Sequence, residues 1–257
     1  MNPLLCDPSL REVRRGLRKI YLRETLSEEA VLEALREPGE VLKQSPKGEV
    51  RVVDGYVVKE SRSGGVGTLK RSLYRNRYRQ GWVAAHFLRS HGVDVPEPIA
   101  FVERRLMGVV FGNCMVSRHL AGYRNVEQFL GALIKKGAGA QTIEIFLNNL
   151  ALAMNKLTAT GAYHADLSGK NILTRDGQYF YFIDLDAVQL DVPYTEDLRL
   201  KNHVQLYDSF CDALTDQVLV PFIEQMLPRE LDLRVWMPRV RKEQKERRKR
   251  TALKQGL

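Results

Sequence analysis

The sequence predicts an α+β fold of two lobes, in which a small antiparallel-sheet lobe precedes a mostly helical one. Three observations carry this prediction. Short β-type runs separated by turn signals fill residues 40 to 60, a helical stripe covers residues 143 to 157, and a cluster of polar residues lies beside short strands further on. A chain of 257 residues is long enough to bury a substantial core in such an arrangement.

Residues 9 to 23 are expected to form a helix. Leu10, Val13, Leu17 and Ile20 recur at helical spacing, and arginines fill the other face. We expect this helix to pack on the body of the protein, with a basic amphipathic helix on an anionic membrane surface as the alternative. Residues 1–30 are therefore set apart as a basic N-terminal helical segment.

Residues 31–120 are expected to form the N-lobe, which begins with a meander of three short strands. These strands are Val41–Leu42, Glu49–Val53 and Tyr56–Lys59, separated by turn signals at Ser45–Gly48 and Asp54–Gly55. A loop over residues 61–68, a long basic helix over 70–90 and strands over 99–103 and 111–117 complete the lobe.

Residues 121–238 are expected to form a mostly helical C-lobe. The helix marked by the stripe at 143–157 ends at Gly161. Two short strands, Ile172–Thr174 and Tyr179–Ile183, flank the turn at Asp176–Gly177, and helices follow at about 197–214 and 216–227.

The formal net charge of +9 is concentrated in one segment. Residues 239–257 carry nine basic residues and two acids, which leaves the rest of the chain near neutral. Such a basic tail is usually solvated or disordered, and an anionic partner is the alternative. A near-neutral body argues against nucleic-acid binding, and we expect no nucleic-acid partner.

The remaining composition predicts a cytoplasmic protein. The sequence has no apolar run long enough to span a bilayer and no signal-peptide pattern near its start. Cys6, Cys114 and Cys211 are far apart and form no C-x-x-C pair, which indicates reduced thiols rather than a disulfide framework or a zinc site.

The stretch from Tyr163 to Leu173 matches the pattern H-x-D-L-x-x-x-N, which is the catalytic loop of the kinase fold. Phosphoryl transfer needs a carboxylate that orients the attacking hydroxyl and takes its proton, and this role falls to Asp166. Asn171 offers an oxygen ligand for Mg²⁺. His164 and Lys170, within the same motif, are expected to support the loop.

Asp184 follows the second of the two short strands, where the other metal ligand of a kinase is expected. Taken singly, Asp166 could cap a turn, Asn171 could bond to the loop backbone and His164 could be a core residue. Their joint spacing between strands instead predicts a protein-kinase-like fold that uses ATP and Mg²⁺.

Lys59 ends an apolar strand of the meander and is expected to be the lysine that binds the α- and β-phosphates of ATP. The alternative is an ordinary exposed lysine. No glycine-rich loop is present, and Ser45–Gly48, with one glycine, occupies the place of a phosphate-covering loop.

From about residue 40 to 215 the chain resembles the bacterial lipopolysaccharide core kinases of the Kdo/WaaP family. The segments that carry the resemblance are Tyr56–Lys59, Gly92–Ala100, Phe101–Arg105, Val116–Gly122, Tyr163–Leu173, Ile183–Asp186 and Arg199–Leu206. The resemblance implies ATP-dependent phosphorylation of a heptose or Kdo hydroxyl in the lipopolysaccharide inner core or its lipid A-core precursor.

For the site, the resemblance implies Lys59 on ATP, Asp166 as the base, and Asn171 and Asp184 on Mg²⁺. It also implies a hinge beside the adenine, formed by Ser117, Arg118, His119 and Leu120. Because such precursors are modified at the inner membrane, the basic termini are expected to hold the protein peripherally on its anionic cytoplasmic face.

Two departures bear on the substrate. No acid lies near Gln80–Gly81, where the helix glutamate that pairs with the ATP lysine is expected, and Glu60 and Glu103 are the substitutes that we consider. Ala165 replaces the arginine common in protein kinases, which argues against control by activation-loop phosphorylation, and the absence of Ala-Pro-Glu argues against peptide substrates. The alternatives are a small-molecule or antibiotic kinase, a protein Ser/Thr kinase-like or pseudokinase regulator, and a basic RNA-binding module.

Overall fold

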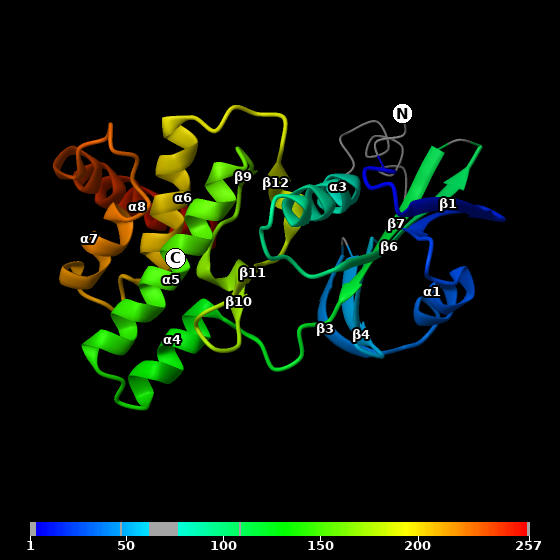
Figure 1. Ribbon diagram of the computed structural model, residues 1–257, viewed down its shortest axis with the longest axis horizontal. Coiled ribbons are helices and arrows are strands. Elements are labelled where there is room, and N and C mark those ends of the chain that lie inside the picture. Colours follow the sequence, from blue (N-terminus) through cyan, green and yellow to red (C-terminus); the bar gives the residue numbers. More distant parts are fainter. Residues whose placement is uncertain (1–3, 47, 62–76, 108, 256–257) are drawn as a thin grey trace. The chain divides into compact units, whose positions relative to one another are not determined.

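The computed structural model describes residues 4–46, 48–61, 77–107 and 109–255. The chain divides into two compact units. The first unit comprises Met1–His91, Val95–Ala121 and Leu185–Ala187, and the second comprises Gly92–Asp94, Gly122–Asp184 and Val188–Leu257. Figure 1 shows that strands dominate the first unit and helices the second, in agreement with the predicted α+β class.

An antiparallel sheet forms the framework of the first unit. Within the described residues it has seven strands in the order β1-β2-β6-β7-β5-β4-β3. The strands are β1 Leu10–Arg15, β2 Arg18–Arg23, β3 Glu40–Ser45, β4 Gly48–Val53, β5 Tyr56–Ser61, β6 Pro98–Leu106 and β7 Val109–Arg118. The meander predicted over residues 40 to 60 is confirmed as β3, β4 and β5.

Helices pack on both faces of this sheet. One face buries Ile20, Val58 and Val102 together with Val31 of α1 (Glu28–Ala34). The other face buries Tyr21 and Phe101 against Trp82 of α3 (Arg77–Ser90). Because successive side chains of a strand alternate between faces, Lys59, which follows Val58, points to the α3 side.

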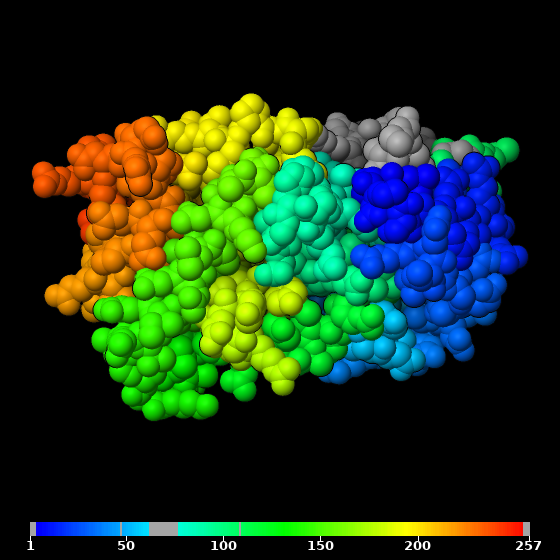
Figure 2. Space-filling view, viewed as in Figure 1, coloured from blue at the N-terminus to red at the C-terminus, as the bar shows by residue number. Residues whose placement is uncertain are grey.

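The helix expected over residues 9–23 is wrong, because this segment is the hairpin of β1 and β2. The two strands pair from Leu10 with Arg23 to Arg15 with Arg18, joined by a two-residue loop. Gly16 begins that loop with a φ of 56°, a conformation that hairpin turns require and glycine adopts without strain. Pairing of β2 with β6 extends the sheet, and Figure 2 shows the dark-blue N-terminal residues on the surface of this unit.

Other N-lobe expectations are met in part. The strands expected over 99–103 and 111–117 exist but are longer, as β6 and β7. The helix expected over 70–90 is described from Arg77 onward, and its first residues lie outside the described part of the chain. Most of the loop expected over 61–68 and Lys47 of the Ser45–Gly48 turn also lie outside it.

Helices form most of the second unit. They are α4 Val126–Lys135, α5 Ala140–Ala159, α6 Glu196–Phe210, α7 Asp216–Glu224 and α8 Leu233–Gln255. The short strands are β8 Arg124–Asn125, β9 Tyr163–His164, β10 Ile172–Thr174, β11 Phe180–Phe182 and β12 Val188–Gln189. In the described ranges, no helix combines the length and apolar character needed to cross a membrane.

The basic segment 239–257, expected as a solvated or disordered tail, is helical through Gln255 and belongs to α8. This helix packs on α6. Trp236 is buried and donates from Nε1 to Nδ1 of the buried His203 at 2.9 Å. Burial, followed by the charge of Arg199, lowers the pKa of His203 to about 3, so the ring is neutral and can accept this bond. The boundary drawn at residue 238 therefore falls inside a helix.

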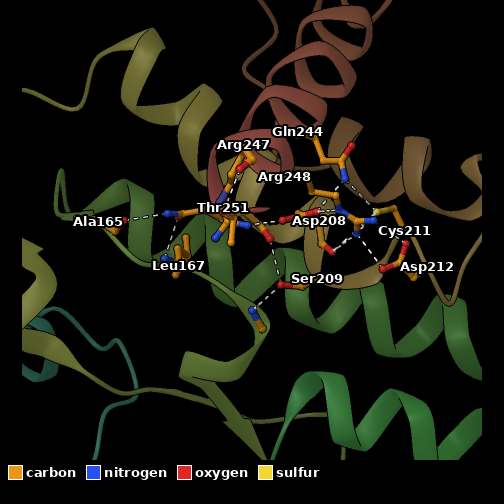
Figure 3. Close-up of polar contacts among 12 residues, drawn as sticks. Ala165, Leu167, Asp208, Ser209, Cys211, Asp212, Gln244, Arg247, Arg248 and Thr251 are labelled. Atoms are coloured by element: carbon orange, nitrogen blue, oxygen red, sulfur yellow. Dashed lines mark hydrogen bonds and ion pairs between the residues drawn. The ribbon is translucent and has the colours of Figure 1, made fainter. Parts of the chain in front are cut away.

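Asp208 of α6 binds two arginines of α8, as Figure 3 shows. Its carboxylate accepts from Gln244 at 2.8 Å, from Arg248 at 2.5 Å and from Arg247. Burial by itself raises the carboxyl pKa, but hydrogen bonds from Gln244 and Arg248 and the charges of Arg248 and Arg247 outweigh it. The pKa of Asp208 therefore lies below its ordinary value.

We predict that Asp208→Asn lowers the free energy of unfolding by about 1–3 kcal/mol at pH 7, because Gln244, Arg247 and Arg248 lose a charged acceptor that is only 11% exposed. A carboxylate with a depressed folded pKa contributes stability above its unfolded pKa, and this contribution disappears as the pH falls through the folded pKa. The difference between wild type and variant, measured by denaturant titration, should therefore shrink below about pH 4.

Asp212→Asn is the matched control, because Asp212 also binds Arg248, at 2.9 Å, but its side chain is 78% exposed whereas that of Asp208 is 11% exposed. Exposed ion pairs contribute about 0–1 kcal/mol, so this variant should unfold nearly as the wild type does. Equal losses in both variants, or a loss in Asp208→Asn that does not depend on pH, would contradict the assignment.

Candidate active site

Asp166 and Asn171 lie together in the loop between β9 and β10. Nδ2 of Asn171 donates to the Asp166 carbonyl oxygen at 2.8 Å and to its carboxylate Oδ2 at 3.0 Å. The short 3₁₀ turn Gly169–Asn171 brings the amide back toward the start of the loop. Asp166 is exposed, so the loop presents its carboxylate to solvent while the Asn171 amide limits its rotation.

His164 connects the start of this loop to the strand that precedes Asp184. Its buried ring accepts from the Asp166 amide at Nδ1, at 3.3 Å, and lies 3.0 Å from the Ile183 carbonyl through Nε2. Because one nitrogen accepts from an amide and the other faces a carbonyl, the ring carries its proton on Nε2. The Ile183 amide also donates to the Asn171 carbonyl at 2.9 Å. Asp184 therefore follows a residue, Ile183, that is bound to both His164 and Asn171.

Asp184 has a φ of 58°, in the left-handed region of backbone space. Aspartate tolerates this region better than most residues, since its short side chain can bond locally. The conformation turns the chain sharply after β11 and starts the 3₁₀ turn Leu185–Ala187, which we call η2. The Asp184 side chain is exposed at this turn.

Side chains of α6 hold the loop backbone on both sides of Asp166. Gln205 donates to the Ala165 carbonyl at 2.8 Å and accepts from the Leu167 amide at 2.9 Å, and Figure 3 shows the bonds that end at Ala165 and Leu167. Asn202 donates to the His164 carbonyl at 2.8 Å. The Ser209 hydroxyl accepts from the Gly169 amide at 2.8 Å.

Sequence reasoning did not assign roles to these α6 residues. The segment Arg199–Leu206, which carries part of the resemblance to the family, contains Asn202 and Gln205. Their three-residue spacing places both amides on one side of a helix, and this was the signal that could have identified them.

The residues expected to bind Mg²⁺ offer suitable donors. Since Nδ2 of Asn171 is bound to Asp166, Oδ1 is the amide atom left for a cation. Oxygen ligands from an amide and a carboxylate, completed by nucleotide phosphates and water, suit Mg²⁺. A site of another kind, built from three His, Cys, Asp or Glu side chains, does not occur among the described residues. Lys170, expected to support the loop, is exposed on the 3₁₀ turn.

Lys59 pairs with a carboxylate that sequence reasoning did not consider. Its Nζ lies 2.5 Å from Oδ1 of Asp186 in η2, within the first unit. Neither expected substitute takes this part. Glu60 points to the opposite face of the sheet and binds Arg51 and Arg104.

Glu103 shares the α3 face of the sheet with Lys59, but its carboxylate binds other residues. It is fully buried and binds Arg79 of α3 and, at 2.9 Å, Arg105. Glu60 and Glu103, the substitutes considered for the helix glutamate, are therefore both bound to arginines and not to Lys59.

The segment expected to be the hinge ends the last strand of the first unit. Ser117 and Arg118 close β7, and Ser117 pairs with Val57. The His119 amide donates to the Gly55 carbonyl at 2.9 Å. Leu120 follows, and the chain passes to the second unit at Gly122. The segment thus lies where the chain leaves the sheet, and its contact with adenine stays a prediction.

Comparison with known proteins identifies relatives of the chain. The model of the lipopolysaccharide kinase (Kdo/WaaP) family matches residues 28–227, a range that includes the whole resemblance over 40–215. A solved structure of WaaP in complex with acyl carrier protein has a TM-score of 0.65 at 20% sequence identity. That match covers 88% of this chain and 98% of the other, and shows a shared fold. No curated protein matches the chain.

We predict that substitutions of Gln205 loosen the loop in a graded order. Gln205→Glu can still accept from the Leu167 amide but cannot donate to the Ala165 carbonyl, whereas Gln205→Ala loses both bonds. A backbone group that loses its partner costs about 1–3 kcal/mol where it is buried. Hydrogen exchange of residues 165–169, followed by mass spectrometry, should therefore accelerate in the order wild type, Glu, Ala.

Lys201→Ala is the control, since Lys201 is an exposed residue of the same helix. It should leave the exchange of residues 165–169 unchanged. The same acceleration in Lys201→Ala and Gln205→Ala would mean that α6 responds as a whole and that the two bonds are not responsible.

Proposed function

Because the chain belongs to the lipopolysaccharide kinase (Kdo/WaaP) family, we propose that it phosphorylates a heptose or Kdo hydroxyl of the lipopolysaccharide inner core through Asp166, Asn171 and Asp184. The observation that carries the assignment is the set of bonds joining the three positions. Asn171 donates to Asp166, and Ile183, the residue before Asp184, donates to the Asn171 carbonyl. ATP use follows from the kinase family.

The Asp166 carboxylate acts on the acceptor sugar. Asn171 occupies its Oδ2, which leaves Oδ1 to accept a hydrogen bond from the acceptor hydroxyl. As the hydroxyl oxygen bonds to the γ-phosphorus, the bond from that phosphorus to the bridging oxygen breaks. The hydroxyl proton passes to Asp166 and ADP leaves.

Asn171 Oδ1 and the Asp184 carboxylate would hold Mg²⁺, which when bound neutralises charge on the ATP phosphates. The two residues are suited to this because the bonds of Ile183 fix the backbone next to both. Lys59 is assigned to the α- and β-phosphates, and the Ser117–Leu120 segment to the adenine side of the nucleotide.

We predict that Asp166→Asn lowers kcat by about 10²–10⁴-fold, because the amide keeps the size of the carboxylate but cannot take a proton. Thermal stabilisation by ATP and Mg²⁺ should persist in this variant and disappear in Asp184→Asn. The activity assay follows phosphate transfer from ATP to purified lipopolysaccharide whose core phosphates have been removed. Mass spectrometry of the core oligosaccharide then identifies the phosphorylated sugar.

Asp176→Asn is the matched control. Asp176 is exposed in the turn between β10 and β11, and it accepts from the Gln178 and Tyr179 amides through an oxygen that asparagine retains. It should phosphorylate core sugars at the wild-type rate. Wild-type transfer by Asp166→Asn would remove Asp166 from the mechanism, and transfer to small alcohols alone would place the protein among small-molecule kinases.

We also propose that α8 contacts an anionic surface through lysines on its outer face, and not through a loose tail. Lys242 and Lys245 are exposed, and they lie on the side of α8 opposite the buried Val240 and Gln244. The arginines at 247 and 248 are instead engaged by Asp208. Lys242 and Lys245 are thus exposed basic residues of α8 that do not bind Asp208 and can meet anionic lipids.

Reversing both charges, Lys242→Glu with Lys245→Glu, should weaken binding to phosphatidylglycerol-containing vesicles by tenfold or more, since each well-placed basic residue contributes about 1 kcal/mol. Lys135→Glu with Lys136→Glu changes the net charge equally at another exposed site and should bind as the wild type does. Purified acyl carrier protein, the partner of WaaP in the similar structure, is the second ligand to titrate. If Lys242→Glu with Lys245→Glu weakens binding to acyl carrier protein but not to vesicles, the result would contradict the membrane assignment.

A further inference from the structure

Lys59 contacts side chains from two other elements of the first unit. The Asp186 carboxylate of η2 lies 2.5 Å from its Nζ. The ring of Tyr78, on α3, lies with its centroid 5.8 Å from the same nitrogen, within range of a cation–π contact. Strand β5, helix α3 and the 3₁₀ turn therefore define the position of one ammonium group.

Helix α3 contributes a glycine where a carboxylate would be expected. Gly81 follows Tyr78 by three residues, so the two positions lie on the same side of the helix. A Cβ at Gly81 would come within 3.1 Å of the Asp186 amide nitrogen and 3.4 Å of its Cα. Because Gly81 has no side chain, η2 packs directly on α3. This packing places the Asp186 carboxylate beside Lys59.

We propose that Asp186 is a positioning residue that takes the place of the missing helix glutamate by holding the Lys59 ammonium where it meets the ATP phosphates. The inference rests on the proposed function of Lys59 and deepens it. Asp186 comes from the segment after Asp184, so a single stretch of chain would supply both a metal ligand and the partner of the ATP lysine.

Glu60 and Glu103, the neighbouring acids, support this assignment because both are already bound to arginines. Glu60 faces the other side of the sheet, and Glu103, on the correct side, is fully buried between Arg79 and Arg105. Moving either carboxylate to Lys59 would leave buried or half-buried arginines without their partners, at a cost of several kcal/mol. Asp186 needs no such rearrangement.

A double-mutant cycle tests whether Asp186 acts through Lys59. Asp186→Asn keeps the side-chain size and removes the charge, and we expect kcat/KM for ATP to fall roughly tenfold or more, the scale of one close charge pair. Lys59→Met gives its own loss. If Asp186 acts by positioning Lys59, Asp186→Asn should cause little further loss in the Lys59→Met background. Asp186→Glu, which keeps the charge on a longer side chain, should recover part of the activity.

Three outcomes would overturn the proposal. Additive losses in the double variant would mean that Asp186 works independently of Lys59. A raised requirement for Mg²⁺ in Asp186→Asn, with an unchanged requirement in Lys59→Met, would make Asp186 a metal ligand. Tighter binding of ATP by Asp186→Asn would mean that the carboxylate competes with the phosphates for the ammonium group.

Gly81→Ala tests the packing that brings Asp186 to Lys59 without altering either residue. Its Cβ would push η2 back by a few tenths of an ångström. We expect lower kcat/KM for ATP although alanine favours the helix by about 1 kcal/mol over glycine. Gly131→Ala in α4 is the control, because its Cβ would meet nothing within 4 Å. It should leave activity unchanged; equal activity in the two variants would contradict the role of the glycine.

Binding measurements separate failure of this inference from failure of the proposed function. Isothermal titration with ATP and Mg²⁺, and in parallel with adenosine, needs no acceptor sugar. Asp186→Asn should weaken the affinity for ATP and leave the affinity for adenosine unchanged, since adenosine carries no phosphate for Lys59. Wild-type protein that binds ATP but phosphorylates no core sugar would reject the proposed acceptor and still test Asp186.

Discussion

Hydrogen bonds from α6 to the backbone around Asp166 are the constraint on which the site depends. Residues 165–168 belong to no helix or strand, so their amides and carbonyls need partners from elsewhere. Gln205 and Ser209 supply them on one side of α6, together with Asn202. The loop then needs little freedom of its own, and Asn171 and Ile183 can complete the site by short-range bonds.

The same helix explains why a strongly basic segment is ordered. Asp208 precedes Ser209 on α6, and its carboxylate binds arginines of α8, while His203 accepts from Trp236. Asp208 offsets part of the positive charge that would otherwise repel itself along α8. A net charge counted along the sequence therefore overstates what α8 offers to an external surface, and leaves mainly its outer lysines.

In the first unit, sheet geometry and one missing side chain place Lys59, the lysine proposed to bind ATP. Strand alternation turns Lys59 toward α3, and Gly81 lets the backbone at Asp186 approach that helix. The kinase fold needs a carboxylate beside this lysine, but it does not need that carboxylate to come from the helix. In this chain the carboxylate beside Lys59 is that of Asp186, which comes from η2 and not from the helix.

By itself, the sequence determined the motif residues Asp166, Asn171 and Asp184, the β3–β5 meander and the helical stripe of α5, because periodicity and turn chemistry act over a few residues. It misassigned residues 9–23, whose apolar spacing fits a helix as well as the hairpin that Gly16 and pairing with β6 select. It also left Asp186 unassigned. Lys59 and Asp186 are 127 residues apart, and contacts at such separation have no local signature, so only the tertiary structure decided them.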